Sequence, residues 1–215
     1  CAVDRRRALR ARPRHACQQR SRHRPRRCGH DSWGSMAGIG FAQSRIAEQG
    51  GTGHWNDPDM LVIGHLGWGP SLHPTQLTRN EQMTHITLWA MLAAPLLLGC
   101  DLRQLDEFTL ALVTNDDVLA IDQDVLGEPC SRIAQSARTE VWARPLWDGT
   151  LAVALFNRAR SEAVMAVSWK DLHRDGPQPV RDCWRKRDVG VQQDGYRTAV
   201  PRHGAVLLRI DQIRD

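Results

Sequence analysis

The sequence predicts an α/β domain followed by an all-β domain, and three observations support this prediction. Between residues 31 and 125, segments with helical periodicity alternate with short apolar runs, an order typical of a parallel sheet covered by helices. After residue 138 the hydrophobic period changes to two, as in antiparallel strands. Turn residues such as Asp148–Gly149 separate these later runs. A chain of 215 residues is long enough for both domains.

Residues 1–30 differ from the rest of the chain in composition. They hold eleven arginines against one acid, Asp4, which gives them a net charge of +10. Because the whole chain has a net charge of +5, the remaining residues carry −5. The segment contains no Ile, Phe, Met or Trp and shows no regular hydrophobic period, so it cannot build a core.

Three interpretations of this arginine-rich segment compete. It resembles a basic arm for nucleic acid or an anionic surface, or an organelle transit peptide, although it lacks an amphipathic pattern. It also has the composition of a GC-rich coding sequence read out of frame. We favour the last interpretation, expect residues 1–30 to be non-native or disordered, and expect no nucleic-acid partner.

The ends of the chain and its apolar runs limit what can be predicted about targeting. The chain begins with Cys1 rather than Met, which suggests an incomplete sequence, so no localisation is predicted. A secretory signal requires an apolar stretch after its basic residues, and no such stretch follows the basic residues here. The apolar run over residues 88–98 is too short to span a bilayer and contains a proline, so we expect no membrane partner.

The first helix is expected after Asp31, which we predict as its N-cap, and it should end at Gly50–Gly51. Apolar residues recur at helical spacing between these positions, although glycines weaken the pattern. The run MLVIG at residues 60–64 predicts a short buried strand. Glycines and prolines indicate a loop over residues 65–76.

A capping box marks the start of the next helix. Thr78 precedes Glu81 by three residues, which predicts a helix that runs to about Ala93 and ends before Pro95. Three further elements are expected after it: a second buried strand at 95–99 and two short helices at 105–115 and 116–124.

The all-β part is expected to follow a linker near Gly127–Arg138. Six period-2 runs predict a small antiparallel β domain, in the manner of a sandwich. The predicted strands are 139–146, 149–157, 162–169, 179–186, 196–201 and 204–210.

The cysteines and histidines do not form a local metal motif, and no metal or cofactor is predicted. The six cysteines lie too far apart to define a disulfide framework, and Cys100 is expected to be a small buried residue. His85 is expected to be a structural histidine one helical turn before Trp89. Four histidines are too irregularly spaced for a ligand motif, namely His54, His65, His73 and His85.

The segment GHWNDPDMLVIG carries the strongest chemical signal. Asp57 and Asp59 are paired carboxylates, which suit general acid and base catalysis, but NDPD is also a turn in which such side chains bind the backbone. Trp55 and Trp68 are loop tryptophans that suit either sugar stacking or a buried anchor. Asp101 follows the expected strand at 95–99, a position where sites form in barrels.

Two long strings, GHWNDPDMLVIG and LTRNEQMTHITLWAMLAAPLLLGCDLRQLDEFTLALVTNDDVLAIDQDVLG, closely resemble melibiase-type α-galactosidases of glycoside hydrolase family 27. The similarity runs from about Asp31 to Gly127, and the β domain fits as well. It implies the C-terminal part of a (β/α)8 barrel over residues 31–127. It also implies an antiparallel β-sandwich over residues 136–211.

The resemblance also implies a retaining mechanism with two aspartates that lie earlier in the family sequence. The segment DSWGSM at 31–36 matches only the end of the acid/base motif, and Cys28 stands at the acid/base position. The nucleophile motif has no counterpart, so no catalytic residue is predicted and the chain as given should be inactive. The implied substrate-binding residues are Asp59, which supports the sugar site, and Met60, which lines it.

The implied partner of the family is an α-galactoside oligosaccharide. Alternatives are a parent enzyme specific for α-N-acetylgalactosamine or β-L-arabinopyranose, or a non-catalytic carbohydrate-binding remnant. Residues 31–125 supply about two barrel strands, whereas a closed barrel needs about 250 residues. We therefore expect an unpaired apolar sheet edge that favours aggregation.

Overall fold

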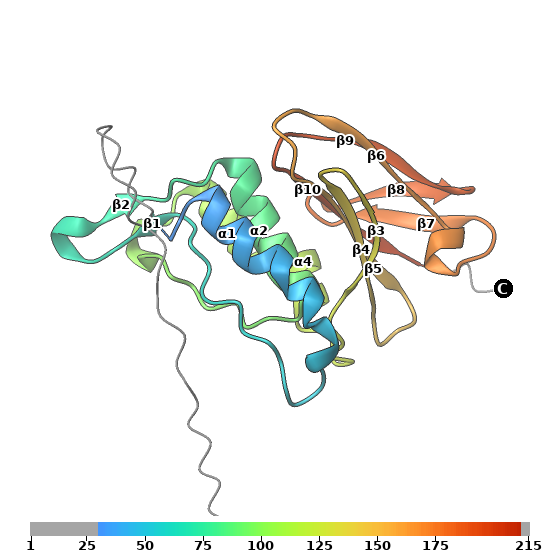
Figure 1. Ribbon diagram of the computed structural model, residues 1–215, viewed down its shortest axis with the longest axis horizontal. Helices are drawn as coiled ribbons and strands as arrows, with labels where there is room; N and C mark the ends of the chain where they lie inside the picture. Colours follow the sequence, from blue (N-terminus) through green and yellow to red (C-terminus); the bar gives the residue numbers. More distant parts are fainter. Residues whose placement is uncertain (1–29, 212–215) are drawn as a thin grey trace, which may run out of the picture.

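The computed structural model describes residues 30–211. The segments 1–29 and 212–215, and with them Cys28 and the predictions for the arginine-rich segment, lie outside the described residues. Figure 1 shows a layer of helices, with α1 and α2 side by side, next to a twisted six-stranded sheet. The loops and the β1–β2 hairpin extend from the far end of the helical layer.

Helix α1 (Trp33–Gly40) begins one residue later than predicted. Ser32 is its N-cap, and the Ser32 hydroxyl accepts a hydrogen bond from Ser35 N at 3.3 Å. The predicted cap, Asp31, is instead turned toward Gln76, whose backbone and side-chain amides donate to its carboxylate at 3.0 and 2.9 Å. The chain continues in two 3₁₀ turns, η1 (Phe41–Arg45) and η2 (Ala47–Gln49).

The close packing of α1 on α2 depends on Gly40. A Cβ at this position would meet Leu88 at 2.6 Å and Trp89 at 2.7 Å, so a larger residue would force the two helices apart. The glycines that weaken the helical pattern of the sequence therefore include one that the packing requires.

Helix α2 (Arg79–Met91) confirms the predicted capping box. The Thr78 hydroxyl accepts from Glu81 N, and a Glu81 carboxylate oxygen accepts from Thr78 N at 2.7 Å. The helix ends two residues before Ala93, which adopts a positive φ of 53°. Ile86, Leu88, Trp89 and Met91 are all buried.

The two predicted parallel strands meet at one bridge, between Leu61 and Leu98. Leu61 N donates to Leu97 O at 2.7 Å, and Gly99 N donates to Leu61 O at 3.0 Å. Leu61 and Ile63 are buried, which confirms the prediction of a buried strand at 60–64. The prediction of a buried strand at 95–99 was wrong for Leu97 and Leu98, which are 55% and 40% exposed. The second segment has no sheet neighbour on its other side among residues 30–211, so its leucines face solvent.

The segment predicted as a loop at 65–76 contains a short hairpin. Strand β1 (His65–Leu66) pairs with β2 (His73–Pro74), and the 3₁₀ turn η3 (Gly69–Ser71) lies between them. After the 3₁₀ turn η4, the two predicted short helices are confirmed. These elements are η4 (Leu102–Gln104), α3 (Glu107–Val113) and α4 (Asp116–Asp122).

The C-terminal part forms a six-stranded antiparallel sheet in the order β3-β4-β5-β10-β7-β8 and a two-stranded sheet, β6-β9. The strands are β3 (Ser131–Ser136), β4 (Thr139–Pro145), β5 (Leu151–Asn157), β6 (Ala163–Ser168), β7 (Gln178–Asp182), β8 (Arg187–Gln192), β9 (Gly195–Val200) and β10 (Ala205–Ile210). A 3₁₀ turn, η5 (Lys170–Leu172), follows β6.

All six predicted strands are confirmed, and two others were missed. Strand β3 occupies Ser131–Ser136, so the prediction of a linker there was wrong. Every residue of β3 is exposed, and a strand that buries no side chain leaves no period-2 signal in its sequence. The second missed strand, β8, is also largely exposed.

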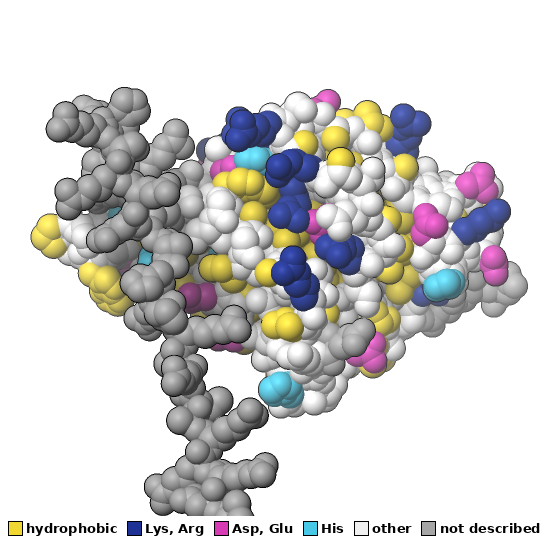
Figure 2. Space-filling view, viewed as in Figure 1, with side chains coloured by type: hydrophobic (Ala, Val, Ile, Leu, Met, Phe, Trp, Pro, Cys, Tyr) yellow, Lys and Arg dark blue, Asp and Glu magenta, His cyan; other side chains and the backbone are white. Residues whose placement is uncertain are grey.

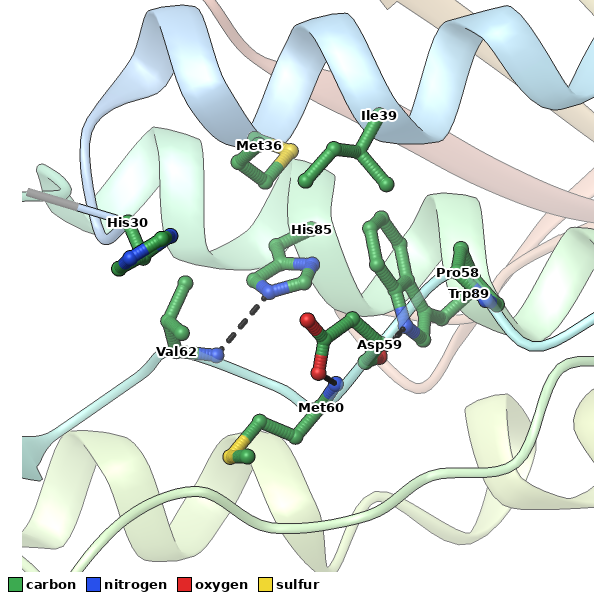
Figure 3. A pocket seen from close by; sticks show the side chains of 9 residues that line it. All are labelled: His30, Met36, Ile39, Pro58, Asp59, Met60, Val62, His85 and Trp89. Atoms are coloured by element: carbon green, nitrogen blue, oxygen red, sulfur yellow. Dashed lines mark hydrogen bonds between the residues drawn. The ribbon is translucent and has the colours of Figure 1, made fainter. Parts of the chain in front are cut away.

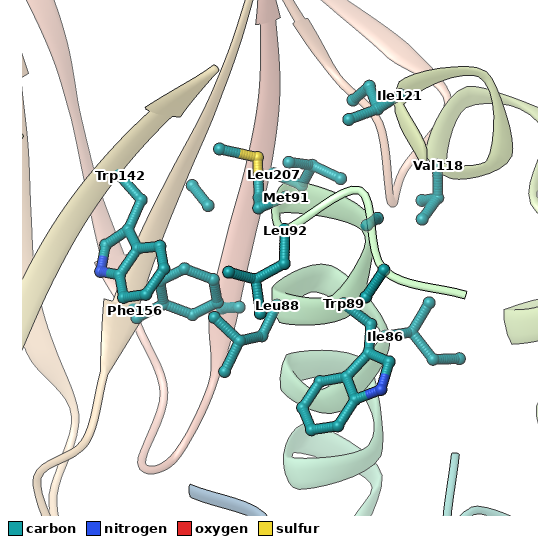
Figure 4. Close-up of a cluster of buried hydrophobic side chains, with 14 of the residues drawn as sticks. Ile86, Leu88, Trp89, Met91, Leu92, Val118, Ile121, Trp142, Phe156 and Leu207 are labelled. Atoms are coloured by element: carbon teal, nitrogen blue, oxygen red, sulfur yellow. The ribbon is translucent and has the colours of Figure 1, made fainter. Parts of the chain in front are cut away.

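The large sheet is buried on both faces. One face packs on the helices through a cluster that includes Leu88, Met91, Ile121, Trp142 and Phe156 (Figure 4). The other face packs on β6-β9 through a second cluster that includes Val153, Leu155, Met165, Val167 and Leu208. Because the first cluster spans both parts of the chain, helices and sandwich share one core. No helix of residues 30–211 has the length and apolar character that a membrane crossing needs.

Candidate functional site

Asp57 and Asp59 hold the backbone of the turn in which they lie. Asp59 N donates to an Asp57 carboxylate oxygen at 2.9 Å, and Met60 N donates to an Asp59 carboxylate oxygen at 2.7 Å. Asp59 has a φ of 83°, which is unfavourable for a residue other than glycine. The Trp89 indole fixes this conformation by donating to Asp59 O at 2.7 Å. This geometry supports the scaffold interpretation of the pair.

A cavity of about 280 Å³ lies beside this turn (Figure 3). Asp59 and Met60 contribute the strand side of its wall, and Met60 is 48% exposed. The opposite walls come from the helices, and these positions were not predicted as site residues. They are Met36 and Ile39 of α1 and His85 and Trp89 of α2, and His30, Pro58 and Val62 complete the lining.

His85 ties the cavity wall to helix α2. Its Nε2 accepts a hydrogen bond from Val62 N at 3.1 Å, and its ring meets the Trp89 ring edge to face with centroids 4.1 Å apart. Burial lowers the pKa of His85 to about 3, so the ring is neutral at physiological pH and carries its proton on Nδ1. Nδ1 has no hydrogen-bond partner among the described residues. The contact of Nε2 with Val62 N supports the structural role predicted for His85, but the ring is not fully satisfied as that prediction assumed.

The strand edge at residues 60–64 is closed by side chains. Beside the Asp59–Met60 contact, Val62 N is bound by His85 and Gly64 N donates to a Gln82 oxygen at 3.2 Å. The Thr75 hydroxyl donates to Val62 O at 2.8 Å. The expectation of an unpaired edge was therefore wrong for this strand, because neighbouring side chains satisfy its backbone groups. Among residues 30–211, the segment at 96–100 does have the unpaired edge that was expected.

A second cavity, of about 740 Å³, lies between two loops that follow the parallel segments. Gly67–Leu72 forms one side and Leu98–Gln104 the other, and Met60 lies at the boundary with the first cavity. Hydrogen bonds from Arg103 lower the pKa of Asp101 to about 2, so this carboxylate is charged. Cys100 is half-buried rather than buried as predicted, because the segment at 96–100 is open on one side.

The two loop tryptophans differ in role. The Trp55 indole donates to Gly127 O at 3.0 Å and so anchors the loop, but Trp55 is 45% exposed, so the prediction that such an anchor is buried was wrong for it. Trp68 is 90% exposed and lines the second cavity. Among residues 30–211, no three His, Cys, Asp or Glu side chains lie close enough together to bind a metal ion.

These features define a class of protein: part of a barrel of parallel strands and outer helices, with cavities at its mouth, followed by an antiparallel sandwich. Comparison with protein families identifies the class further. The family model described as alpha galactosidase A matches residues 14–124, and the alpha galactosidase C-terminal beta sandwich domain matches residues 136–210. The chain therefore belongs to the α-galactosidases (melibiases) of glycoside hydrolase family 27.

Individual relatives agree with this assignment. An alpha-galactosidase of Cyamopsis tetragonoloba is 39% identical over 82% of this chain and 41% of its own length. Human alpha-galactosidase A is 44% identical over 60% of this chain and 29% of its own length. Among solved structures, a GH27 β-L-arabinopyranosidase from Geobacillus stearothermophilus, in complex with arabinose, superposes with a TM-score of 0.80. That match has 33% identity and covers 86% of this chain and 43% of the other.

The chain thus spans less than half the length of these relatives. The family match begins at residue 14, inside the arginine-rich segment, so part of that segment aligns with the family. The predicted fold class, a partial barrel followed by an antiparallel sandwich, is confirmed by both family matches.

Proposed function

We propose that this chain is part of a hydrolase that acts on terminal α-galactosides. Its helices and parallel segments form one wall of the sugar pocket, and its C-terminal part is the sandwich domain. The observation that supports this proposal most directly is the cavity beside Asp59 and Met60. It combines one carboxylate, two thioethers and an indole, which is the mixture of apolar surface and few polar groups found in small-molecule sites.

In this proposal Met60 contacts the apolar face of the sugar, and Asp59 supports the site. One Asp59 oxygen binds Met60 N, and the other, which has no hydrogen-bond partner within residues 30–211, is placed in this proposal to accept a sugar hydroxyl. Replacing Met60 with Ala should weaken galactose binding without unfolding the protein, because its side chain is half exposed. Isothermal titration calorimetry with galactose measures this change, and unchanged affinity would remove Met60 from the site.

The chain as given should not hydrolyse α-galactosides. A retaining glycosidase needs two carboxyl groups about 5–5.5 Å apart, one as nucleophile and one as acid/base. Asp57 and Asp59 are instead bound to the backbone of their own turn. Purified protein should release no more p-nitrophenol from p-nitrophenyl α-galactoside than a heat-killed control, and reproducible turnover would refute this part of the proposal.

A second specificity, for β-L-arabinopyranosides, is favoured by the superposition with the Geobacillus enzyme. Its sugar lacks the C6 hydroxymethyl group of galactose but shares the remaining ring hydroxyl arrangement. Parallel titrations with galactose and L-arabinose separate the two proposals. Tighter binding of arabinose would favour the second one, and binding of either sugar without turnover would be consistent with a carbohydrate-binding role.

A further inference from the structure

Trp68 lies in a loop whose backbone is held by hydrogen bonds to Ser71. Trp68 N donates to the Ser71 hydroxyl at 3.2 Å, and that hydroxyl donates to Trp68 O at 2.7 Å. Gly67 has a φ of 95°, and a Cβ there would lie 2.5 Å from Ser71 O, so only glycine fits. His73 Nδ1 contacts Ser71 O at 2.8 Å. The loop therefore fixes the backbone at Trp68, and the residue is 90% exposed.

The position of this loop is that of a barrel site. The bridge between Leu61 and Leu98 is parallel, and both the Trp68 loop and residues 101–104 follow the carboxyl ends of the bridged segments. Barrel enzymes form their sites at this end of the strands. Figure 2 shows hydrophobic side chains gathered at the same end of the molecule, where β1 and β2 lie.

Trp68 lines two cavities that both border on Met60. One is the cavity of about 740 Å³, and the other has a volume of about 360 Å³. Met60 also lines the proposed galactose pocket. The two cavities that Trp68 lines therefore adjoin that pocket at Met60. A ligand longer than one sugar ring could therefore contact both residues.

Polar side chains line both cavities together with Trp68. In the larger cavity, Arg103 Nη2 binds Asp101 at 2.9 Å beside Gln104. In the smaller one, Asp31 is 4% exposed and is bound by Gln76. An exposed indole at cavities that hydrogen-bonding side chains also line suits a sugar ring, which has apolar C–H faces and hydroxyl groups at its rim.

We propose that Trp68 is a stacking platform for the second sugar of an α-galactosyl oligosaccharide, next to the galactose pocket at Met60. The inference rests on the proposed function for the galactose pocket and extends it to the remainder of the substrate. In this arrangement the Trp68 indole covers one face of the second sugar ring. Arg103, Asp101 and Gln104 bind hydroxyl groups at its rim.

The test uses the full chain, with raffinose as the oligosaccharide and galactose as the single sugar. Trp68→Ala should weaken raffinose binding roughly tenfold in isothermal titration calorimetry and leave galactose affinity unchanged. Trp147→Ala is the matched control, because Trp147 is 67% exposed on the turn between β4 and β5 and lines none of the cavities described above. Circular dichroism establishes that both variants are folded.

The outcomes separate the two proposals. If wild-type protein binds galactose but binds raffinose no more tightly, or if it binds both and Trp68→Ala binds raffinose like wild type, the stacking platform is refuted while the galactose pocket stands. If wild-type protein binds neither sugar, both proposals are refuted. If raffinose binding depends on Trp68 but galactose does not bind, the platform is supported and the galactose pocket is refuted. Equal weakening by Trp147→Ala would show a non-specific effect and overturn the assignment of Trp68.

Discussion

At the residue scale, His85 should make stability fall in acid. Its pKa in the folded protein is about 3, below the ordinary value of 6.5, so the unfolded chain binds more protons between these values. Its contribution is complete above pH 6.5 and is lost as pH falls toward 3, by up to roughly 1.4 kcal/mol per pH unit. His85→Gln removes this dependence, which urea titrations at several pH values can measure.

The control for this prediction is His54→Gln, because His54 is exposed in a loop. This variant should keep the wild-type dependence of unfolding free energy on pH. If His85→Gln and wild type showed parallel curves below pH 6.5, the titration assigned to His85 would be wrong.

Asp122 should act in the opposite direction. Burial raises its pKa from 3.8 to about 7, and one carboxylate oxygen has no hydrogen-bond partner among the described residues. The folded protein therefore binds more protons than the unfolded chain between pH 3.8 and 7. This contribution to stability is complete below pH 3.8 and is lost as pH rises through 7.

Asp122→Asn should remove that contribution. The variant's unfolding free energy should fall more steeply with acid than that of wild type between pH 7 and 4, because the effect of His85 is then unopposed. Urea titration followed by tryptophan fluorescence measures this difference. Asp116→Asn, on the same helix with a side chain that is 90% exposed, is the matched control and should follow wild type.

Single residues also show where sequence reasoning reached its limit. The turn of Asp57 and Asp59 could be predicted because Asx turns depend on local sequence. The burial of Arg144 could not be predicted, because its place in the alternating pattern of β4 resembles that of a solvent-facing residue. It is fully buried, and its guanidinium donates to Ala90 O and Ile121 O at 2.7 Å. Only the packing of the sheet on the ends of α2 and α4 creates this site.

At the element scale, the capping box of α2 has two functions. Glu81 binds Thr78 N with one oxygen, and His203 Nδ1 lies 2.6 Å from its other oxygen. Thr78→Ala should lower the unfolding free energy by about 1 kcal/mol, the usual value of an N-cap. Glu81→Ala should lower it by about 3 kcal/mol, because it also leaves His203 buried without a partner.

Urea denaturation measures both changes. Thr114→Ala is the control, because among the described residues the Thr114 hydroxyl bonds only to Leu110 O of α3, and its loss should cost under about 0.5 kcal/mol. Equal effects of Thr78→Ala and Glu81→Ala would mean that the contact with His203 contributes nothing to stability.

Elements with a strong local signal were predictable, and those defined by their neighbours were not. Helix α2 has a cap and an apolar face, so its start was found from sequence. The run at 95–99 has the apolar composition of a buried strand, yet Leu97 and Leu98 are exposed because burial depends on the adjacent strand. Strand β3 was missed for the opposite reason. It pairs with β4 but buries no side chain, so its sequence has no apolar pattern that would indicate a strand.

At the scale of the whole molecule, the helices and the sandwich form a single packed unit. The core of Leu88, Met91, Trp142 and Phe156 contains residues of both parts. His203, in the turn between β9 and β10, stacks on Trp33 of α1 with centroids 4.1 Å apart. The division into two domains that sequence periodicity predicts therefore describes topology, whereas the hydrophobic core is shared across it.

The two edges of the parallel segment differ, and this difference predicts how the molecule associates. Side chains of His85, Gln82 and Thr75 close the edge at residues 60–64. On the other edge, the backbone N–H and C=O of Leu98 have no hydrogen-bond partner within residues 30–211. An exposed apolar strand edge of this kind can pair with a second chain.

Wild-type protein should therefore self-associate as its concentration rises, and Leu98→Lys should suppress this association, because a lysine on a strand edge opposes pairing. Leu110→Lys is the matched control, since Leu110 is 48% exposed and lies on helix α3 rather than on a strand. Static light scattering over a concentration series measures the effect. If both lysine variants reduced association equally, general surface charge would explain the result. A selective effect of Leu98→Lys would locate the contact at the open edge of the segment at 96–100.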